Sequence, residues 1–509
     1  MSDTVTPTTA GQHLLITVSL VVAVTLVSLD MTIVNVALPH MQASLNAGAD
    51  EIIWVLTSYL VASAIAMPLV GWMASRFGRN RIFFTCVAGF TLASVLCGVA
   101  SSLEMMVCAR LAQGACGAGL VPLAQATLLD INPPSRHARA MAVFSLGTMV
   151  GPMLGPTIGG YITDTFTWRW VFLMNIPVGL GALAGLWFAT RGMRQAMIAS
   201  RFDWFGFLAV SLAIGAFQLI LDRGHQLGWF DSAEIGIEAG IAALALWCAV
   251  VHTMTTPGGF IKPAVFANRN FVLGCLFSAA AGLVCFATAP MIVVMQQNLF
   301  GYTPMFTGEL GMARSVAMVV GIVLVTRAVN RIGPRIPLAA ALMLTASGMG
   351  MMAGLTLQAD PAFMLVASIV QGMGQGMLFV PMSVIVYGSL APELRNEGSV
   401  IYSLMRMIGA SVGLSMIQVR LNETQADAHS RLAAHIRPDA PMVSWQLPDL
   451  DLWAPAQALR IQADIVREAS MQGYINVFSM ITVATVLLVP LLLAMRPARK
   501  TTTLLATGE

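Results

Sequence analysis

The stretch LLITVSLVVAVTLVSLDMTIVNVA, residues 14–37, decides the class of fold. Asp30 is its single charged residue, and the stretch is as long as the ~20 residues with which a helix crosses the hydrocarbon core of a bilayer. Similar stretches recur along nearly the whole chain, in which 57% of the residues are hydrophobic and 10% are charged. A soluble domain carries about 25% charged residues. We therefore predict an all-α polytopic membrane protein, because a backbone in lipid must satisfy its own polar groups.

The apolar stretches predict fourteen membrane-spanning helices, and the basic residues between them orient the chain. We expect the spans at residues 14–37, 52–74, 82–101, 104–128, 140–162, 170–190, 204–221, 235–254, 270–295, 306–328, 336–357, 361–387, 398–419 and 473–495. If both termini face the cytoplasm, the short inner loops hold most arginines and lysines, whereas the short outer loops hold only Arg169 and Arg223. Positive residues favour the cytoplasmic side. Residues 1–13 and 496–509 are therefore predicted to be cytoplasmic, and the long loop 420–472 to face outward.

An internal repeat divides the chain into two similar halves. Residues Ser75–Gly78, between the second and third spans, recur as Asn330–Gly333 between the tenth and eleventh. Further pairs follow at a nearly constant offset: Gln113-Gly114 with Gln371-Gly372, Val121-Pro122 with Val380-Pro381, Phe144-Ser145-Leu146 with Tyr402-Ser403-Leu404, and Gly151 with Gly409. We predict two six-helix halves, 14–190 and 270–495, with two inserted helices in 204–254. Transporters of the major facilitator type bind substrate between such halves, although other polytopic proteins also arise by duplication.

Asp30 and Arg110 are predicted to lie at the same depth in the membrane. Each falls roughly 10 Å below the outer end of its span, at a rise of 1.5 Å per residue. A carboxylate at that depth costs several kcal/mol when charged and is usually functional. Burial favours its neutral form and a neighbouring arginine favours its charged form, so a change of conformation or a bound substrate could load or release a proton. The alternative is a static ion pair that aids membrane insertion.

Four other polar residues and Glu309 complete the candidate transport site. Glu309 is a second candidate for proton coupling, although its place near an outer end also fits a side chain that faces water. Asn35, Gln113, Arg314 and Arg406 are candidates for lining the substrate cavity. The two arginines suggest weak acids as substrates, whereas the carboxylate of the first span suggests cations, so the sequence leaves the charge of the substrate open.

The fifth predicted span carries a glycine at every fourth position. The residues are Gly147, Gly151, Gly155 and Gly159, with Pro152 and Pro156 between them. Glycines on one face allow another helix to approach closely. Prolines remove backbone donors and bend a helix. We therefore expect this span to pack directly against a neighbouring helix.

Several segments resemble those of the fourteen-helix drug:proton antiporters of the major facilitator superfamily, most closely the EmrB-type multidrug exporters. They are Leu29–Pro39, Gly71–Arg79, Arg110–Gly114, Gly147–Pro156, Trp168–Phe172, Asn175–Gly179 and Leu221–Gly224. The resemblance implies that the loop with Gly71, Arg76, Gly78 and Arg79 gates the inner side, and that the glycine-rich span favours exchange over co-transport. The family often has an acidic residue at the position of Ser75. In the family this acidic residue is thought to hold the inner gate closed by pairing with basic groups. Serine cannot form an ion pair, so the sequence leaves this contact in question.

The resemblance also implies an activity, a location and partners. It implies a proton-coupled antiporter in a bacterial inner membrane, which exports hydrophobic or amphipathic small molecules and uses the proton gradient without a cofactor. It further implies a periplasmic membrane-fusion adaptor (EmrA-like) and an outer-membrane channel (TolC-like) as partners, with no nucleic acid. The outer loop, in which a helix is predicted over 455–471, would help to dock the adaptor. Alternatively, this loop caps the outer vestibule.

Two other functions compete with multidrug export. A dedicated carrier of one metabolite or siderophore would share the fold, and the neighbouring genes would separate the two. A membrane-embedded enzyme is disfavoured, because the histidines lie in loops or near helix ends and form no metal-ligand cluster. The chain has no Gly-x-x-x-x-Gly-Lys-Ser/Thr phosphate loop, so we do not expect ATP to drive it.

Overall fold

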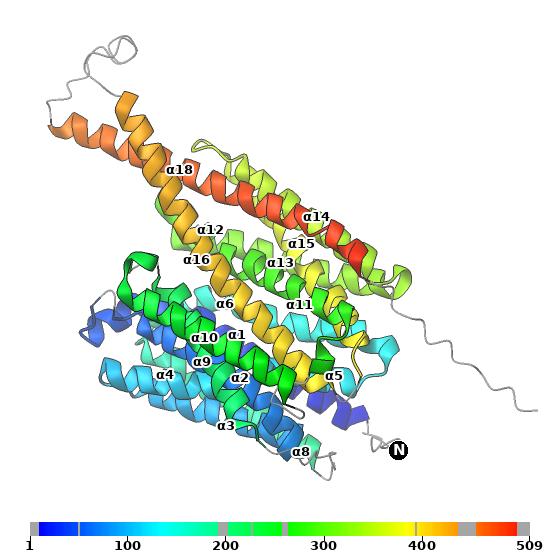
Figure 1. The fold of residues 1–509 in the computed structure, drawn as a ribbon. Helices are drawn as coiled ribbons and strands as arrows, with labels where there is room; N and C mark the ends of the chain where they lie inside the picture. The colour runs from blue at the N-terminus through cyan, green and yellow to red at the C-terminus, as the bar shows by residue number, and fades with distance from the viewer. Residues whose placement is uncertain are drawn as a thin grey trace, which may run out of the picture.

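The computed structural model describes residues 10–48, 51–191, 202–224, 227–256, 263–391, 394–435 and 455–495. These residues form a bundle of long helices that run in roughly the same direction (Figure 1). Thirteen helices of the described part are long and apolar enough to cross a membrane. The 29-residue helix α6 (His137–Thr165) takes the place of the remaining predicted span. The architecture therefore supports the predicted all-α membrane fold.

The first half comprises six spans. They are α1 (Ala10–Ser44), α2 (Trp54–Phe77), α3 (Arg79–Gly98), α4 (Leu103–Gly117) with α5 (Leu120–Asp130), α6, and α7 (Arg169–Leu173) with α8 (Asn175–Thr190). The inserted pair consists of α9 (Trp204–Arg223) and α10 (Ala233–Thr255). Each span lies within a few residues of its predicted range, because its hydropathy is continuous and loops with charged residues interrupt it.

The second half also has six spans, and the first of them is irregular. This span consists of α11 (Arg269–Gly282), the π-helix η4 (Leu283–Ala287), α12 (Thr288–Val294) and the π-helix η5 (Met295–Leu299). The others are α13 (Pro304–Ile332), α14 (Arg335–Ala353), α15 (Pro361–Gly388), α16 (Arg395–His435), and α18 (Pro455–Leu487) with the 3-10 turn η7 (Pro490–Ala494). Single π-helical turns inside a span often accompany functional sites.

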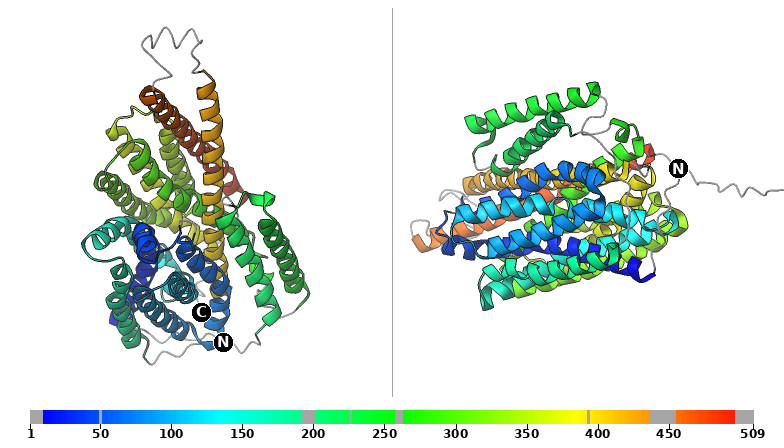
Figure 2. Two further views of the ribbon diagram at one scale, coloured as in Figure 1. Left: turned by 90° about the vertical axis from the view of Figure 1, so that its left-hand side faces the viewer. Right: turned by 90° about the horizontal axis from the view of Figure 1, so that it is seen from below.

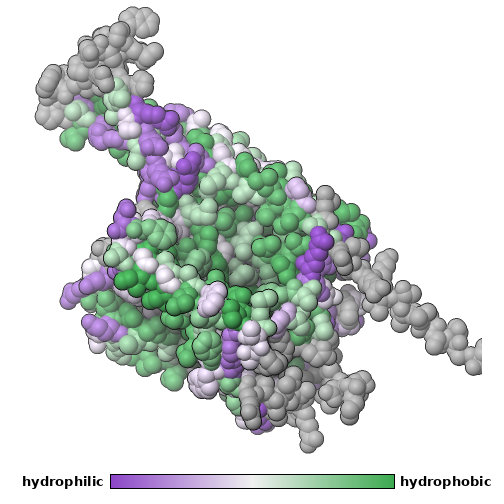
Figure 3. All heavy atoms as spheres, viewed as in Figure 1, coloured by the Kyte–Doolittle hydropathy of each residue, from purple (hydrophilic) through white to green (hydrophobic). Residues whose placement is uncertain are grey.

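The two ends of the bundle are named here after the predicted orientation. The inner end carries Gly78, Asp130 and Gly333, and the outer end carries Ser44 and Pro304. The first described helix begins and the last described helix ends at the inner end (Figure 1). Seen as spheres, the molecule has a broad hydrophobic face between more hydrophilic regions toward both ends (Figure 3). This distribution is typical of a protein whose middle is surrounded by lipid.

The predicted outer loop 420–472 is helical over its described residues. Helix α16 continues to His435 and helix α18 starts at Pro455, so both project beyond the outer end of the bundle (Figure 1). The predicted helix start at Pro455 is confirmed. Ala428 and Ala469 are 1% and 2% exposed in these projections, because the two helices pack against each other. The apolar stretches end at the membrane boundary, whereas the paired helices continue beyond it. Residues 436–454 lie outside the described part.

The repeat is visible in the backbone at two corresponding turns. Gly78, between α2 and α3, has φ 94°, and Gly333, between α13 and α14, has φ 79°. Both values lie in the left-handed region, which only glycine adopts without strain. The same local rule therefore makes the same tight turn in each half.

The hydrophobic cores show which ends of the halves are joined. One core at the inner end contains residues of both halves, including Leu128 and Met141 with Ile322 and Leu378. At the outer end the halves have separate cores, one around Ile33 and Phe172 and the other around Met291 and Phe478. The halves are therefore packed together at the inner end and apart at the outer end. This arrangement defines an outward-facing conformation.

The inserted helices cover one flank of the junction between the halves. Helix α9 packs against α2 of the first half and α16 of the second, where Ile214 contacts a small core that contains Met67 and Val400. Helix α10 packs on α9 and stands farthest from the bundle (Figure 2). The pair therefore touches both halves, although it belongs to neither.

Candidate functional site

Asp30 and Arg110 form an ion pair inside the first half. Arg110 Nη1 lies 2.8 Å from Asp30 Oδ2, and the two side chains are 1% and 0% exposed. Asp30 comes from the middle of α1 and Arg110 from α4, so the structure brings together the two charges that the sequence places at equal depth. A buried ion pair is stable only when its remaining polar atoms are also hydrogen-bonded.

Two further polar side chains bond atoms of this pair, and a third, Ser94, accepts hydrogen bonds from both of them. Gln113 Nε2 and Asn175 Nδ2 donate to Asp30 Oδ1 over 3.0 and 2.8 Å. Gln113 also donates to Ser94 Oγ over 2.8 Å and accepts from Arg110 Nη1 over 2.6 Å. We call Asp30, Ser94, Arg110, Gln113 and Asn175 the Asp30 network; all five residues are buried.

Arg110 is held on its other sides by α2 and α7. Its Nε donates to the Val55 carbonyl oxygen over 2.9 Å. Its guanidinium lies 4.3 Å from the ring centre of Tyr59 and 5.8 Å from that of Phe172. A cation over aromatic faces gains about 2 kcal/mol or more when it is desolvated. Arg110 therefore has partners that remain if Asp30 changes its charge.

The predicted cavity residues fall into different surroundings. Gln113 is 0% exposed and belongs to the Asp30 network, so its side chain does not face open space in this conformation. Its amide has two donors and an acceptor, which this network uses. Asn35 is exposed on α1, where it donates to the Met31 carbonyl oxygen over 3.0 Å. Glu309 is exposed near the outer end of α13, in the half that does not contain Asp30.

Arg314 and Arg406 lie together in the second half. Both side chains are half-buried, and both lie within electrostatic range of the Cys285 thiol in the π-helix η4. Arg314 packs beside Gly372 of α15, and the backbone of Arg406 packs beside Gly282 of α11. Each is about 15 Å from one end of its helix, at 1.5 Å per residue, so both lie near mid-membrane. The second half thus holds two cations within its spans, where the first half holds an ion pair.

The glycine stripe of α6 packs against α1, as predicted. A Cβ at Gly151 would collide with the Ser28 backbone, and one at Gly155 would collide with the Thr32 side chain. The close approach lets hydroxyl groups of α1 donate to carbonyl oxygens of α6, from Ser28 to Thr148 over 2.7 Å and from Thr32 to Gly151 over 3.0 Å. Gly147 and Gly159 face α1 in the same way, whereas the side chains of Pro152 and Pro156 lie outside the described part.

The inner end is closed by an ion pair that the sequence analysis missed. Asp130, at the end of α5, lies 2.7 Å from both Arg79 of the first half and Arg395 of the second. Ser75 donates to its own helix at Gly71 over 3.2 Å and takes no part in this contact. The signal for Asp130 was an acidic residue in an inner loop whose other charges are basic. Of the predicted gate residues, Gly71 faces Val400 of α16, and Arg76 is half-buried beside the turn at Gly78.

A second polar contact joins the halves one to two turns above Asp130. Gln125 Nε2 donates to Ser383 Oγ over 3.1 Å, and Tyr387 Oη donates to Gln125 Oε1 over 3.0 Å. All three side chains are buried. Hydrogen bonds in a buried site are costly to leave unmade. The inner ends are therefore held by ionic and neutral contacts together.

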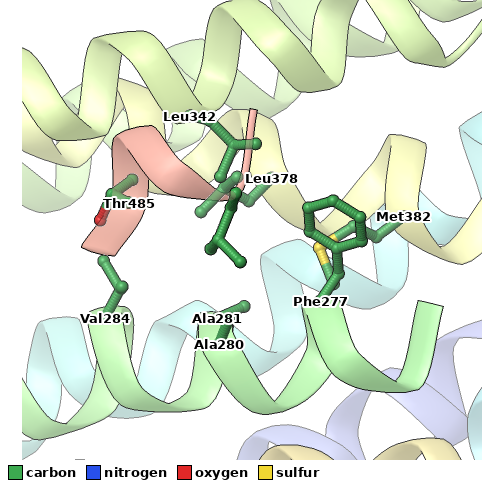
Figure 4. Close-up of a pocket in the computed structure, with 9 residues that line it drawn as sticks. Phe277, Ala280, Ala281, Val284, Leu342, Leu378, Met382 and Thr485 are labelled. Carbon is green, nitrogen blue, oxygen red and sulfur yellow. The ribbon is translucent and has the colours of Figure 1, made fainter. Parts of the chain in front are cut away.

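The small cavity within the second half does not fit a drug-sized ligand. It measures about 10 Å³ and lies between α11, α14, α15 and α18, where Phe277, Leu342, Leu378 and Thr485 line it (Figure 4). A volume of that size holds at most one water molecule. It is a packing defect of the core and not a transport site.

The comparisons with known proteins agree with this fold. The model of the Major Facilitator Superfamily matches residues 20–414, and the chain belongs to this superfamily of membrane transporters. It is 32% identical to the multidrug export protein EmrB of Haemophilus influenzae over 86% of each chain. It is 31% identical to the fatty acid resistance protein FarB of Neisseria gonorrhoeae over 83% of each chain. The structure of the proton:xylose symporter XylE, at 14% identity, matches with a TM-score of 0.60 over 93% of this chain and 94% of that one.

Proposed function

We propose that this transporter is a proton-coupled antiporter that exports hydrophobic or amphipathic small molecules by alternating access. The observation that carries the proposal is the enclosed Asp30–Arg110 pair, with side chains 0% and 1% exposed in a membrane-spanning bundle. Such pairs at membrane depth are a feature of proton relays in pumps and transporters. The names of the relatives, which include multidrug export proteins, support the direction of transport.

The Asp30 network provides a means of coupling. Protonation removes the negative charge of Asp30 and with it the ionic contact to Arg110. Arg110 then keeps its contacts to Val55 and Tyr59, so α4 and α2 stay joined while the hold on α1 weakens. Because α1 is also tied along the glycine stripe of α6, a change at Asp30 reaches the helix pair that forms the wall of the first half.

The energy available from one proton matches this task. One charge moving through about 100 mV supplies about 2.3 kcal/mol. At 1.4 kcal/mol for each factor of ten, this sustains a substrate gradient of roughly forty-fold. No cofactor is needed for this exchange.

We infer that the substrates include weak acids. Asp30 is surrounded by its own donors and offers no open surface to a cationic ligand. Arg314 and Arg406 are half-buried near mid-membrane, where an unpaired cation is costly and an anionic group would stabilise it. Met318 lies one helical turn from Arg314 and Met405 next to Arg406; both are partly buried, and flexible methionine side chains suit varied apolar ligands. One relative is named for resistance to fatty acids, which have this combination of an acidic group and an apolar chain.

We further propose that the chain resides in the bacterial inner membrane with both termini in the cytoplasm. The projecting parts of α16 and α18 would then reach into the periplasm. Between them lies a cleft of about 300 Å³ lined by Gln425, His429 and Val466, among others. These projections offer a surface for an EmrA-like adaptor, which would connect to a TolC-like channel.

The test is transport by the purified protein in proteoliposomes that contain a pH-sensitive dye. Addition of a substrate should move protons in the opposite direction, and an imposed proton gradient should drive substrate uphill. A panel of weakly acidic and cationic amphiphiles would show the preferred charge. Substrate movement with no proton movement would contradict antiport and leave a uniporter.

A further inference from the structure

A second partly buried carboxylate lies on the inserted helix α9, outside the Asp30 network. Asp222 is only partly exposed, although its place at the outer end of α9 predicts a solvated side chain. Its Oδ2 atom is buried and has no hydrogen-bond partner. An ionised carboxylate with an empty oxygen is costly to bury, whereas a protonated one is not.

The surroundings of Asp222 connect the inserted helix to both halves of the transporter. Gln218 Nε2 donates to Asp222 Oδ1 over 3.2 Å and to Ser411 Oγ of α16 over 2.8 Å. Thr57 of α2 lies close to the same carboxylate. We call Thr57, Gln218, Asp222 and Ser411 the insert seam. It joins the first half, the inserted helix and the second half at one point.

No cation neutralises Asp222 within the described residues. The adjacent Arg223 points away, where it pairs with Glu234 of α10 and lies over the Trp54 ring at 5.4 Å. Glu238, also on α10, is the other charged group near Arg223. The residues named near Asp222 on α2 and α16, Thr57 and Ser411, carry uncharged hydroxyl groups. This differs from Asp30, whose charge is matched by Arg110.

We propose that Asp222 is a second proton-binding carboxylate, which holds a proton in this outward-facing conformation. The seam spans helices of both halves, so any rocking of one half against the other must change the Gln218–Ser411 contact. When that contact breaks, the Gln218 N–H that bonded Ser411 becomes free to donate to Asp222 as well, and water can reach Oδ2; both favour ionisation. Asp222 would thus bind a proton in the outward-facing conformation and release it when the halves move. This coupling role rests on the proposed antiport, although proton binding itself does not.

The first measurement is infrared spectroscopy of the carboxylic acid C=O stretch in purified protein in lipid at neutral pH. Wild type should show a band of a buried protonated carboxyl group, and Asp222→Asn should lose that band. Glu234→Gln is the matched control, since it removes an exposed carboxylate one helix away, and should retain it. Absence of an Asp222-dependent band from wild type would overturn the proposal.

The second measurement is the number of protons exchanged per substrate in proteoliposomes. Asp222→Asn should still exchange, with one proton fewer than wild type, and Asp222→Glu should restore the count. An unchanged count in Asp222→Asn would overturn the coupling role and leave Asp222 as a hydrogen-bond acceptor of the seam. If wild type moves no protons while the infrared band is present, the antiport proposal fails and the coupling role with it, whereas the proton-binding site stands.

Discussion

Gln125 and Ser383 occupy corresponding positions in the two halves and hydrogen-bond to each other over 3.1 Å. They are 258 residues apart, which is the offset of the sequence repeat. Two residues related by a two-fold axis along the membrane normal can meet only at that axis. The contact therefore marks the axis near the inner end, and the buried Tyr387 completes it. Rocking of the halves toward an inward-facing state must break these bonds.

Tyr387→Phe should open the inner end. It removes one buried hydrogen bond, worth about 1 kcal/mol, and so should raise the inward-facing population about fivefold. Spin labels at Phe77 and Ile332 would measure the change, because both are exposed (45% and 56%) at corresponding inner ends of the halves. A Cys108→Ser background removes the exposed native thiol.

Tyr161→Phe is the matched control for this experiment. Tyr161 is 65% exposed on α6, so its hydroxyl can bond to solvent in either conformation. In Tyr161→Phe, the distribution of distances between the labels at Phe77 and Ile332 should equal that of the labelled protein without this substitution. If Tyr387→Phe also equals the parent, the hydrogen bond to Gln125 does not hold the halves together.

Asp130→Asn should also shift the equilibrium toward the inward-facing state. It weakens the contacts to Arg79 and Arg395, of which only the second crosses between halves. The Asp130 side chain is 30% exposed, so solvent screens the pair and we expect about 1 kcal/mol or less. Added salt should reproduce part of the shift in wild type and none in Asp130→Asn. Equal salt responses of the two proteins would argue against this latch.

Gly151→Ala should destabilise the protein or separate α6 from α1. The added methyl group meets the Ser28 backbone, which cannot rotate away, and overpacking of this kind costs about 1–3 kcal/mol. Gly160→Ala, on the same helix with nothing within 4 Å of the added group, should be neutral or slightly stabilising. Thermal unfolding of both variants in the same detergent is the measurement. Equal melting temperatures would show that the stripe tolerates side chains.

Much of the fold could be predicted from the sequence, because lipid leaves few options. Hydropathy locates the spans, and the repeat pairs the turns at Gly78 and Gly333. The pairing of Asp30 with Arg110 followed from equal depth. Hydropathy says nothing about helices outside lipid, so the projection of α16 at Ala428 was missed, whereas helical periodicity predicted a helix around Ala469.

The rest of the site depends on which side chains of other helices lie nearby, and the sequence alone does not show this. Gln113 was expected in a cavity, but it completes the hydrogen bonds of a buried pair. Asp130 and Asp222 stand at helix ends, where an acid normally meets water. Other helices pack onto those ends in the structure. This packing shows that Asp130 bridges the halves and that Asp222 is partly enclosed.

Arg406→Gln should change substrate preference. If Arg314 and Arg406 receive an acidic group, the variant should lose roughly tenfold in apparent affinity for acidic amphiphiles, since a charged hydrogen bond contributes about 1.5–3 kcal/mol. Neutral and cationic amphiphiles should be affected little. Binding measured by fluorescence quenching with acid and amide forms of one compound gives the comparison. Equal losses for the two forms would place the arginine in a structural role.

The central claim is that Asp30 carries the coupled proton. The direct measurement is substrate-induced proton release from inverted vesicles, with wild type, Asp30→Asn and, as a control, the exposed-loop variant Asp231→Asn. Wild type and Asp231→Asn should release protons promptly when substrate is added, and Asp30→Asn should not, although it still binds substrate. Proton release that persists in Asp30→Asn at the wild-type rate would contradict the account and assign the proton to another group.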